Sequence, residues 1–216
     1  MVVALVVANQ SGHHSSKPNA NNIKVDSIDA MLKGIPQNGI ELGNPNAKVT
    51  LVEFSDPQCP YCGDWARSVF PSLVQKYVRA GTLRVEYRGI AFLGTDSTRL
   101  LGLARAAGLQ NKLWNVVELE FENQGSENSG YATDAFLKGL VNAVPGLDAE
   151  KALSASNTKT MTKTIEAALT LAKQKLKEIT TPTFLLGPTG SNKTTTIVGD
   201  QPLQTFVDAI DAQLKK

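Results

Sequence analysis

The fold is decided by one stretch of the sequence, Glu53-Phe54-Ser55-Asp56-Pro57-Gln58-Cys59-Pro60-Tyr61-Cys62, which holds the only two cysteines of the chain. An apolar pattern typical of a buried strand, over 48–55, gives way here to a helical pattern over 62–80. A Cys-x-x-Cys pair between a strand and a helix is typical of a thiol–disulfide redox centre. We therefore predict redox chemistry at Cys59 and Cys62.

Two other roles for the cysteine pair fit the sequence less well. A zinc site would need two further ligands, and the only histidines, His13 and His14, lie together near the N-terminus. A purely structural disulfide would add little stability, because the stabilisation grows with the length of the closed loop. We therefore expect no metal, and no cofactor other than the redox-active Cys59–Cys62 disulfide itself.

The composition is that of an ordinary globular protein. The 216 residues are 42% hydrophobic, which is enough to fill a core. The 22 basic and 20 acidic residues are interspersed and give a net charge of +2. Because there is no basic stripe with interleaved aromatic residues, we expect no nucleic-acid partner.

The first 22 residues differ in character from the rest. A short apolar run over 2–8 precedes a polar stretch over 9–22 that is rich in Asn and Ser. The apolar run is too short to cross a bilayer, which takes roughly 20 residues, and no basic residues precede it. Residues 1–22 are either a mobile end or short strand, or the remnant of a signal peptide or membrane anchor followed by a flexible linker. The second interpretation predicts an extracytoplasmic protein, where disulfide exchange is useful.

The first part of the folded chain is predicted to contain a β-α-β unit. Residues 23–39 form an N-terminal helical extension, and residues 40–94 form the first half of the main domain. Pro71 should kink the long helix, and the right-handed crossover should make the two longer strands parallel. The predicted elements are a helix within 23–34, a short strand at 40–43, a buried strand at 48–55, a helix at 62–80 and an alternating strand at 83–88.

Residues 95–178 have no convincing strand pattern and are predicted to form an inserted helical domain. The main domain resumes over 179–216 with a hairpin of strands at 183–186 and 195–198 and a final amphipathic helix at 203–214. The fold class is therefore α/β, with a central mixed sheet and a helical insertion. The helices predicted in the insertion are 97–107, 112–123, 133–144, 149–154 and 160–177.

The chemistry of a reactive dithiol explains the position of both cysteines. A thiolate attacks a disulfide, and a helix N-terminus lowers a cysteine pKa from about 8.5 through its partial positive charge and free N–H groups. Cys59 lies at such a terminus and is predicted to be the exposed attacking thiol. Cys62, one turn inward, resolves the mixed disulfide. Pro60 suits the first turn because its missing N–H needs no partner there.

Two acidic residues precede the cysteine pair. Glu53, six residues before Cys59, would have a raised pKa if buried and could then shuttle the proton of Cys62, directly or through water. Alternatively, Glu53 faces solvent at a strand edge, but its apolar neighbours favour the proton role. Asp56 is predicted to cap or brace the start of the helix, or to tune the site electrostatically.

The segment Thr181-Pro182-Thr183, before the first hairpin strand, is a third component of the predicted site. A cis Thr181–Pro182 bond would expose the backbone of Thr181 beside the thiol, where an extended substrate segment could pair with it as an added strand. Only about 5–6% of X–Pro bonds are cis. The residues alone therefore favour a proline that merely begins a strand.

Two motif-like features are interpreted as unrelated to function. The stretch 187–194 is superficially similar to a phosphate-binding loop, but Asn192 replaces the second glycine and a strand pattern follows, which predicts a hairpin turn. Ser, Asp and His are present for a hydrolytic triad, but both histidines lie in the polar N-terminal stretch, which argues against one.

Four motifs together carry a family resemblance. They are Leu42-Gly43-Asn44-Pro45-Asn46-Ala47, Val52-Glu53-Phe54-Ser55-Asp56, Gln58-Cys59-Pro60-Tyr61-Cys62 and Thr181-Pro182-Thr183-Phe184. From about residue 40 to its end, the chain resembles the DsbA-like thiol–disulfide oxidoreductases of the thioredoxin superfamily. The resemblance implies a thioredoxin-like sheet of four or five strands, a cis Thr181–Pro182 bond, attacking Cys59, resolving Cys62 and the acid Glu53. It also implies an extracytoplasmic enzyme that exchanges disulfides with proteins.

Two residues bear on the direction of electron flow within that family. Tyr61 stands where the most strongly oxidising members have a histidine, and Thr181 resembles the isomerase and reductase relatives. The segment before residue 40 offers no dimerisation domain of the kind isomerases have. We therefore expect a monomeric oxidase-type enzyme of moderate oxidising power. It would act on extended or unfolded proteins with cysteines and be recycled by a membrane quinone-coupled partner.

Three alternatives stay open. The first is a disulfide isomerase or reductase of the same fold. The second is a thioredoxin-fold binding protein or chaperone whose cysteine pair is unused, which a harmless Cys59→Ser substitution would favour. The third is a glutaredoxin or glutathione-using transferase, which shares Cys-Pro-Tyr-Cys; the helical insertion and the expected export argue against it.

Overall fold

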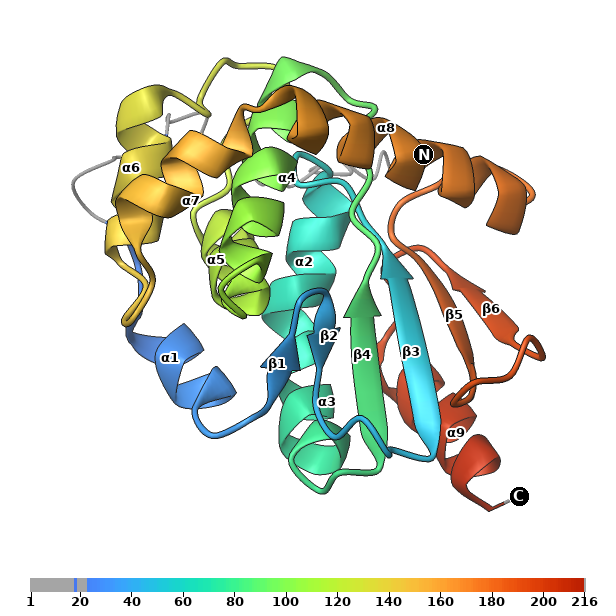
Figure 1. The fold of residues 1–216 in the computed structure, drawn as a ribbon. Helices are drawn as coiled ribbons and strands as arrows, with labels where there is room; N and C mark the ends of the chain where they lie inside the picture. Colours follow the sequence, from blue (N-terminus) through green and yellow to red (C-terminus); the bar gives the residue numbers. More distant parts are fainter. Residues whose placement is uncertain (1–17, 19–22, 216) are drawn as a thin grey trace, which may run out of the picture.

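A mixed sheet forms the centre of the structure (Figure 1). The computed structural model describes residue 18 and residues 23–215, so the interpretations of 1–22 fall outside the described residues except at Pro18. In the described part the strand order is β1-β2-β4-β3-β5-β6. The strands are β1 (Gln37–Asn38), β2 (Glu41–Leu42), β3 (Val49–Phe54), β4 (Leu83–Tyr87), β5 (Thr183–Pro188) and β6 (Thr195–Val198).

The strand directions agree with the predictions, but the number of strands does not. β3 and β4 are parallel, as the β-α-β crossover predicted. β5 is antiparallel to β3, and β6 is antiparallel to β5, which confirms the hairpin. The resemblance implied four or five strands, whereas β1 pairs with β2 to complete a sheet of six among the described residues. A two-residue strand has no periodicity to detect, so β1 was wrongly included in the helical extension.

The helices follow the predicted segments closely. The long helix predicted over 62–80 is divided, because Pro71 has no N–H to bond the carbonyl of Arg67. A π-helical segment, η1 (Val74–Val78), completes it. The helices are α1 (Asp26–Leu32), α2 (Pro60–Ser68), α3 (Phe70–Leu73), α4 (Thr95–Gly108), α5 (Leu113–Glu122), α6 (Asp134–Asn142), α7 (Ala149–Ser156), α8 (Lys159–Lys175) and α9 (Leu203–Leu214).

Different helices cover the two faces of the sheet. Side-chain alternation along β3 puts Leu51 and Glu53 on one face and Phe54 on the other. Leu51 belongs to the main core, together with residues of α2 and α5, whereas Phe54 packs against Ala172 and Leu176 at the end of α8. Figure 1 shows the inserted helices gathered beside the sheet, with α8 running across its top toward β5. Glu53 therefore projects into the main core.

Aromatic packing fixes α2 against the sheet. The Trp65 ring lies 4.6 Å from that of Phe184 on β5, 5.4 Å from Phe70 and 5.7 Å from Phe206 on α9, centroid to centroid. Since Trp65 follows Cys62 by one helical turn, this contact holds the inner cysteine in place. Across 23–215, no helix combines the length and apolar character needed to span a bilayer.

Candidate active site

The loop after β3 brings the predicted dithiol to the N-terminus of α2. Cys59 directly precedes the first helical residue, Pro60, and has extended backbone angles (φ −65°, ψ 118°). The N–H groups of Cys62 and Gly63 donate to the carbonyl oxygen of Cys59 at 3.1 and 3.2 Å, which closes the first turn. Both cysteines are free thiols. The predicted placement of the pair, one turn apart at a helix start, is confirmed.

The prediction of an exposed Cys59 is wrong. Only 5% of this residue is accessible, because its Sγ donates a hydrogen bond to the carbonyl oxygen of Thr181 at 3.3 Å. The segment before β5 therefore covers the thiol, which the local sequence around Cys59 does not indicate. The exposed side chain of the motif is Tyr61, at 64% accessibility. Access of a substrate to the Cys59 sulfur is consequently restricted.

The surroundings lower the pKa of Cys59 from 9.0 to about 6. The largest cause is a hydrogen bond from the Cys62 thiol, which outweighs the opposing effect of burial. Hydrogen bonds from the Thr181 side chain and from the backbone N–H groups of Cys62 and Tyr61 lower the pKa further. The helix N-terminus thus lowers the pKa of Cys59 as predicted, but its effect is smaller than that of the Cys62 thiol. At pH 7 most of the Cys59 sulfur is thiolate.

Cys62 and Glu53 lie in the interior, at 0% and 1% accessibility. The alternative in which Glu53 faces solvent is therefore excluded. Burial raises the pKa of Cys62, and the neighbouring Cys59 raises it further. Burial also raises the pKa of Glu53 to about 8, against a smaller opposing effect of the Ser55 hydroxyl. A carboxylic acid that is neutral at pH 7 thus shares the interior with a thiol that resists ionisation.

Asp56 braces the active-site loop and does not cap α2, which has no side-chain cap. Its Oδ1 accepts hydrogen bonds from the N–H of Gln58 at 2.9 Å and from the Ser97 hydroxyl at 2.6 Å. Its Oδ2 accepts from the N–H groups of Phe92 at 2.9 Å and Leu93 at 3.2 Å. Of the roles predicted for Asp56, bracing is the one that these contacts support.

The Thr181–Pro182 bond is cis, as the resemblance implied and against the preference of the residues alone. The carbonyl oxygen of Pro182 accepts a hydrogen bond from the N–H of Gly199 at 2.8 Å, which ties the segment to the end of β6. The fold brings Cys59 and Thr181 into contact although they are 122 residues apart.

Two glutamines connect the inserted helices to the active-site loop: Gln58 belongs to the motif around the cysteines but had no predicted role, and Gln124 was not predicted. Nε2 of Gln124, just after α5, donates to the carbonyl oxygens of Pro57 at 2.8 Å and Cys59 at 3.0 Å. Gln58 is buried, and its Oε1 accepts the N–H of Asn128 at 2.7 Å. The position next to Cys59 was the only signal for Gln58. Nothing in the sequence marks Gln124.

The motif-like features do not contribute to this site. Residues 187–194 include the predicted turn between β5 and β6, but β5 extends two residues into this stretch, to Pro188. Within residue 18 and residues 23–215, no group of three or more His, Cys, Asp or Glu side chains could hold a metal ion. His13 and His14, on which the zinc and triad alternatives depend, lie outside the described residues.

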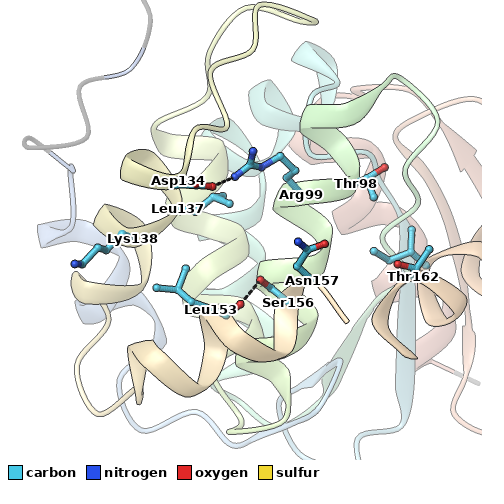
Figure 2. A pocket seen from close by; sticks show the side chains of 10 residues that line it. Thr98, Arg99, Asp134, Leu137, Lys138, Leu153, Ser156, Asn157 and Thr162 are labelled. Atoms are coloured by element: carbon cyan, nitrogen blue, oxygen red, sulfur yellow. Dashed lines mark hydrogen bonds and ion pairs between the residues drawn. The ribbon is translucent and has the colours of Figure 1, made fainter. Parts of the chain in front are cut away.

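A cavity of about 510 Å³ lies among the inserted helices, and none of the predicted site residues lines it. Figure 2 shows that Arg99 of α4 points toward Asp134 of α6, with which it forms an ion pair. On another wall, the Ser156 hydroxyl donates to the carbonyl oxygen of Leu153 at 2.7 Å. This cavity is thus separate from the dithiol site.

Comparisons with known proteins agree with this geometry. The family model described as Thioredoxin matches residues 36–209. The chain belongs to the thioredoxin family. Among curated relatives of this thioredoxin-family protein, a probable disulfide bond formation protein D of Bacillus cereus is 29% identical over 113 residues, 51% of this chain and 52% of the relative. Disulfide bond formation protein D of Bacillus subtilis is 27% identical over 180 residues, 82% of this chain and 73% of the relative. The match thus spans only about half the length of the first relative.

Solved structures share the fold. BdbD from Bacillus subtilis, in the oxidised form, superimposes with a TM-score of 0.73 at 21% identity, covering 84% of this chain and 98% of that chain. Alpha-DsbA1 from Wolbachia pipientis gives 0.71 at 22% identity, covering 85% of this chain and 92% of that chain. The DsbA-like thioredoxin fold expected from the motifs is therefore confirmed.

Proposed function

We propose that this protein is a thiol–disulfide oxidoreductase of the oxidase type, which exchanges disulfides with protein substrates through Cys59 and Cys62. The observation that carries the proposal is the unequal pair of thiols at the start of α2: the pKa of Cys59 is lowered to about 6, whereas burial raises that of Cys62. Two relatives named disulfide bond formation protein D support it.

Oxidation of a substrate would start at the enzyme disulfide. A substrate thiolate attacks the Cys59 sulfur, the S–S bond to Cys62 breaks, and its electron pair passes to the Cys62 sulfur. Glu53, neutral at pH 7, gives its proton to this buried thiolate. A second substrate thiolate then attacks the substrate sulfur of the mixed disulfide and releases Cys59 as a thiolate. Two electrons have then passed from two substrate thiols to the cysteine pair.

The isomerase or reductase alternative uses the same residues in the opposite direction. The Cys59 thiolate attacks a substrate disulfide, Glu53 accepts the proton of Cys62, and the Cys62 thiolate attacks Cys59 to release the substrate. Tyr61 favours this alternative over a strong oxidase because it offers no imidazole to stabilise the thiolate. The proposed enzyme is therefore an oxidase of moderate power.

The remaining parts of the proposal rest on the resemblance of the motifs to DsbA-like enzymes. The enzyme acts outside the cytoplasm as a monomer, and its only redox group is the Cys59–Cys62 disulfide. Its substrates are extended or unfolded proteins with cysteines, which pair with the backbone of Thr181 beside Pro182. A membrane quinone-coupled partner reoxidises it.

The deciding experiment is the equilibrium reduction potential of the Cys59–Cys62 couple against glutathione. A value between about −200 and −120 mV supports the oxidase, whereas a value near about −270 mV supports the reductase. Oxidation of a dithiol peptide should be lost in Cys59→Ser. Undiminished oxidation by that variant would overturn the proposal, and peptide binding without any oxidation would favour the chaperone alternative.

A further inference from the structure

A cleft between α4 and α8 lies away from the dithiol. The two helices pack against each other, and two cavities, of about 290 and 190 Å³, lie along their contact. Both cavities have Arg105 of α4 and Thr164 of α8 in their walls, so they adjoin and are together called the Arg105 cleft. None of the predicted site residues lines it. The cleft is therefore a separate feature of the molecule.

The walls of the larger cavity are mostly apolar. Ile40 reaches it from the turn between β1 and β2, Leu113 from α5 and Met161 from α8. The Thr164 hydroxyl donates to a carbonyl oxygen of its own helix at 3.0 Å, so it already has a partner. Leu109, just after α4, is 73% accessible, so the cavity is reached from the surface. A wall of this kind suits a hydrocarbon chain.

Arg105 gives the cleft a positive charge that no carboxylate balances. The ion pairs found between described residues do not include it. One terminal nitrogen donates to the carbonyl oxygen of Gly89 at 3.2 Å, whereas the buried Nε has no partner. Arg88, in the wall of the smaller cavity, is already paired with Glu86 at 3.0 Å. None of the described residues lining either cavity is Asp or Glu, so an anion would complement the cleft.

The cavity drawn in Figure 2 differs in this respect. It is larger, at about 510 Å³, but the arginine in its wall, Arg99, forms an ion pair with Asp134, which also lines it. Arg99 and Arg105 belong to the same helix, α4. The charge of Arg99 is thus balanced within the protein, whereas that of Arg105 is not. Arg99 is for this reason a matched control for Arg105.

We propose that the Arg105 cleft binds a free single-chain alkyl carboxylate, with the carboxylate on the Arg105 guanidinium and the chain along the apolar wall. The planar guanidinium can hold both oxygens of a carboxylate. A neutral chain would bury the same apolar surface but leave Arg105 unpaired, and a short carboxylate would leave the wall uncovered. Both parts of the ligand are therefore needed. The inference does not depend on the proposed function, because the cleft contains neither Cys59 nor Cys62.

The test is a calorimetric titration of the whole protein with sodium decanoate, below the concentration at which decanoate forms micelles. One site per chain is expected. Octanoate should bind about fifteenfold more weakly, since each of the two missing methylenes costs about fourfold. Decanol should bind about tenfold more weakly or worse, because it cannot form the charged hydrogen bonds. Absence of decanoate binding, or equal affinity for decanol, would overturn the proposal.

Three variants locate the site. Arg105→Gln should weaken decanoate binding about tenfold or more, whereas Arg99→Gln should leave it unchanged. Ala155→Trp, which fills the larger cavity from α7 without altering a charge, should abolish binding. Circular dichroism verifies that each variant is folded. Equal binding by Arg105→Gln and Arg99→Gln, or normal binding by Ala155→Trp, would overturn the proposal. If Arg105→Gln does not fold, Ala155→Trp and the decanol titration decide.

Discussion

Cys59 and Cys62 carry the same functional group, and only their surroundings make them different. The Cys62 thiol and the N–H groups of the helix start stabilise the Cys59 thiolate, whereas the interior disfavours a charge on Cys62. This difference assigns attack and departure to Cys59. It also means that Cys62 needs a group that accepts or donates its proton during the reaction.

The first prediction concerns the reactivity of Cys59. In the reduced protein, alkylation by iodoacetamide should follow a titration with a midpoint near pH 6, because the reagent reacts with the thiolate. The limiting rate should be low for a thiolate, since only 5% of Cys59 is accessible. Mass spectrometry should locate the label on Cys59 and not on Cys62. A midpoint at pH 8 or above would contradict the stabilisation described here.

The second prediction concerns Glu53. Glu53→Gln keeps the shape of the side chain but cannot exchange a proton, so resolution of a Cys59 mixed disulfide should slow about 100-fold. Rapid quenching with acid and separation of the mixed disulfide measures this step. The far-ultraviolet circular dichroism should be unchanged. An unchanged rate would show that Cys62 exchanges its proton by another route.

At the scale of elements, the start of α2 is held from two directions. The segment before β5 contacts Cys59 through Thr181, and the inserted helices reach the same loop through Gln124. The break that Pro71 introduces separates α2 from α3, so α2 is short and depends on these outside contacts. The insertion is therefore part of the active-site support.

The third prediction tests that support. Gln124→Ala removes two hydrogen bonds to the active-site loop and should lower the free energy of unfolding by about 1–3 kcal/mol. It should also increase the alkylation rate of Cys59, because the loop is loosened. Urea denaturation and alkylation kinetics measure the two effects.

Gln110→Ala is the matched control. Gln110 likewise makes two hydrogen bonds, at 3.0 and 3.1 Å to the backbone of Asp148, but at an exposed position within the insertion. Its loss should leave the reactivity of Cys59 unchanged. An equal effect of both substitutions on Cys59 would show that Gln124 has no specific role at the loop.

At the scale of the whole molecule, Glu53 links stability to pH. Its pKa is about 8 in the folded protein and near 4.5 when unfolded. Below pH 4.5 Glu53 is protonated in both the folded and the unfolded state, so its burial does not lower the free energy of unfolding. Between pH 4.5 and 8 only the unfolded state releases it, so the free energy of unfolding falls by up to about 1.4 kcal/mol per pH unit.

The fourth prediction follows from this decrease in the free energy of unfolding with rising pH. Glu53→Gln should be more stable than the unaltered reduced protein by a margin that grows from pH 5 to pH 8. The lowered pKa of Cys59 acts in the opposite direction, adding stability from pH 6 upward, but it is common to both proteins and cancels in the difference. Urea denaturation at both pH values measures the margin. A margin independent of pH would place the folded pKa of Glu53 near its ordinary value.

Those features of the fold that depend on residues close together in the chain could be predicted from the sequence. The apolar run into Cys59, the proline at the helix start and the alternation at 83–88 predicted the β-α-β unit with the dithiol at a helix N-terminus, and the structure has it. The helical insertion and the hairpin followed from periodicity in the same way. Residues 1–22 were interpreted from composition alone and lie, except for Pro18, outside the described residues.

Tertiary structure alone decided the surroundings of the thiols. The contact of Thr181 with Cys59 and the hydrogen bonds from Gln124 to the active-site loop join residues far apart in the sequence. The local sequence pattern does not indicate such contacts. Burial and pKa depend on them, because both are set by what surrounds a group from every side. The sequence therefore predicted which residues carry the chemistry, and the packing decided that Cys59 is covered and that Gln124 supports its loop.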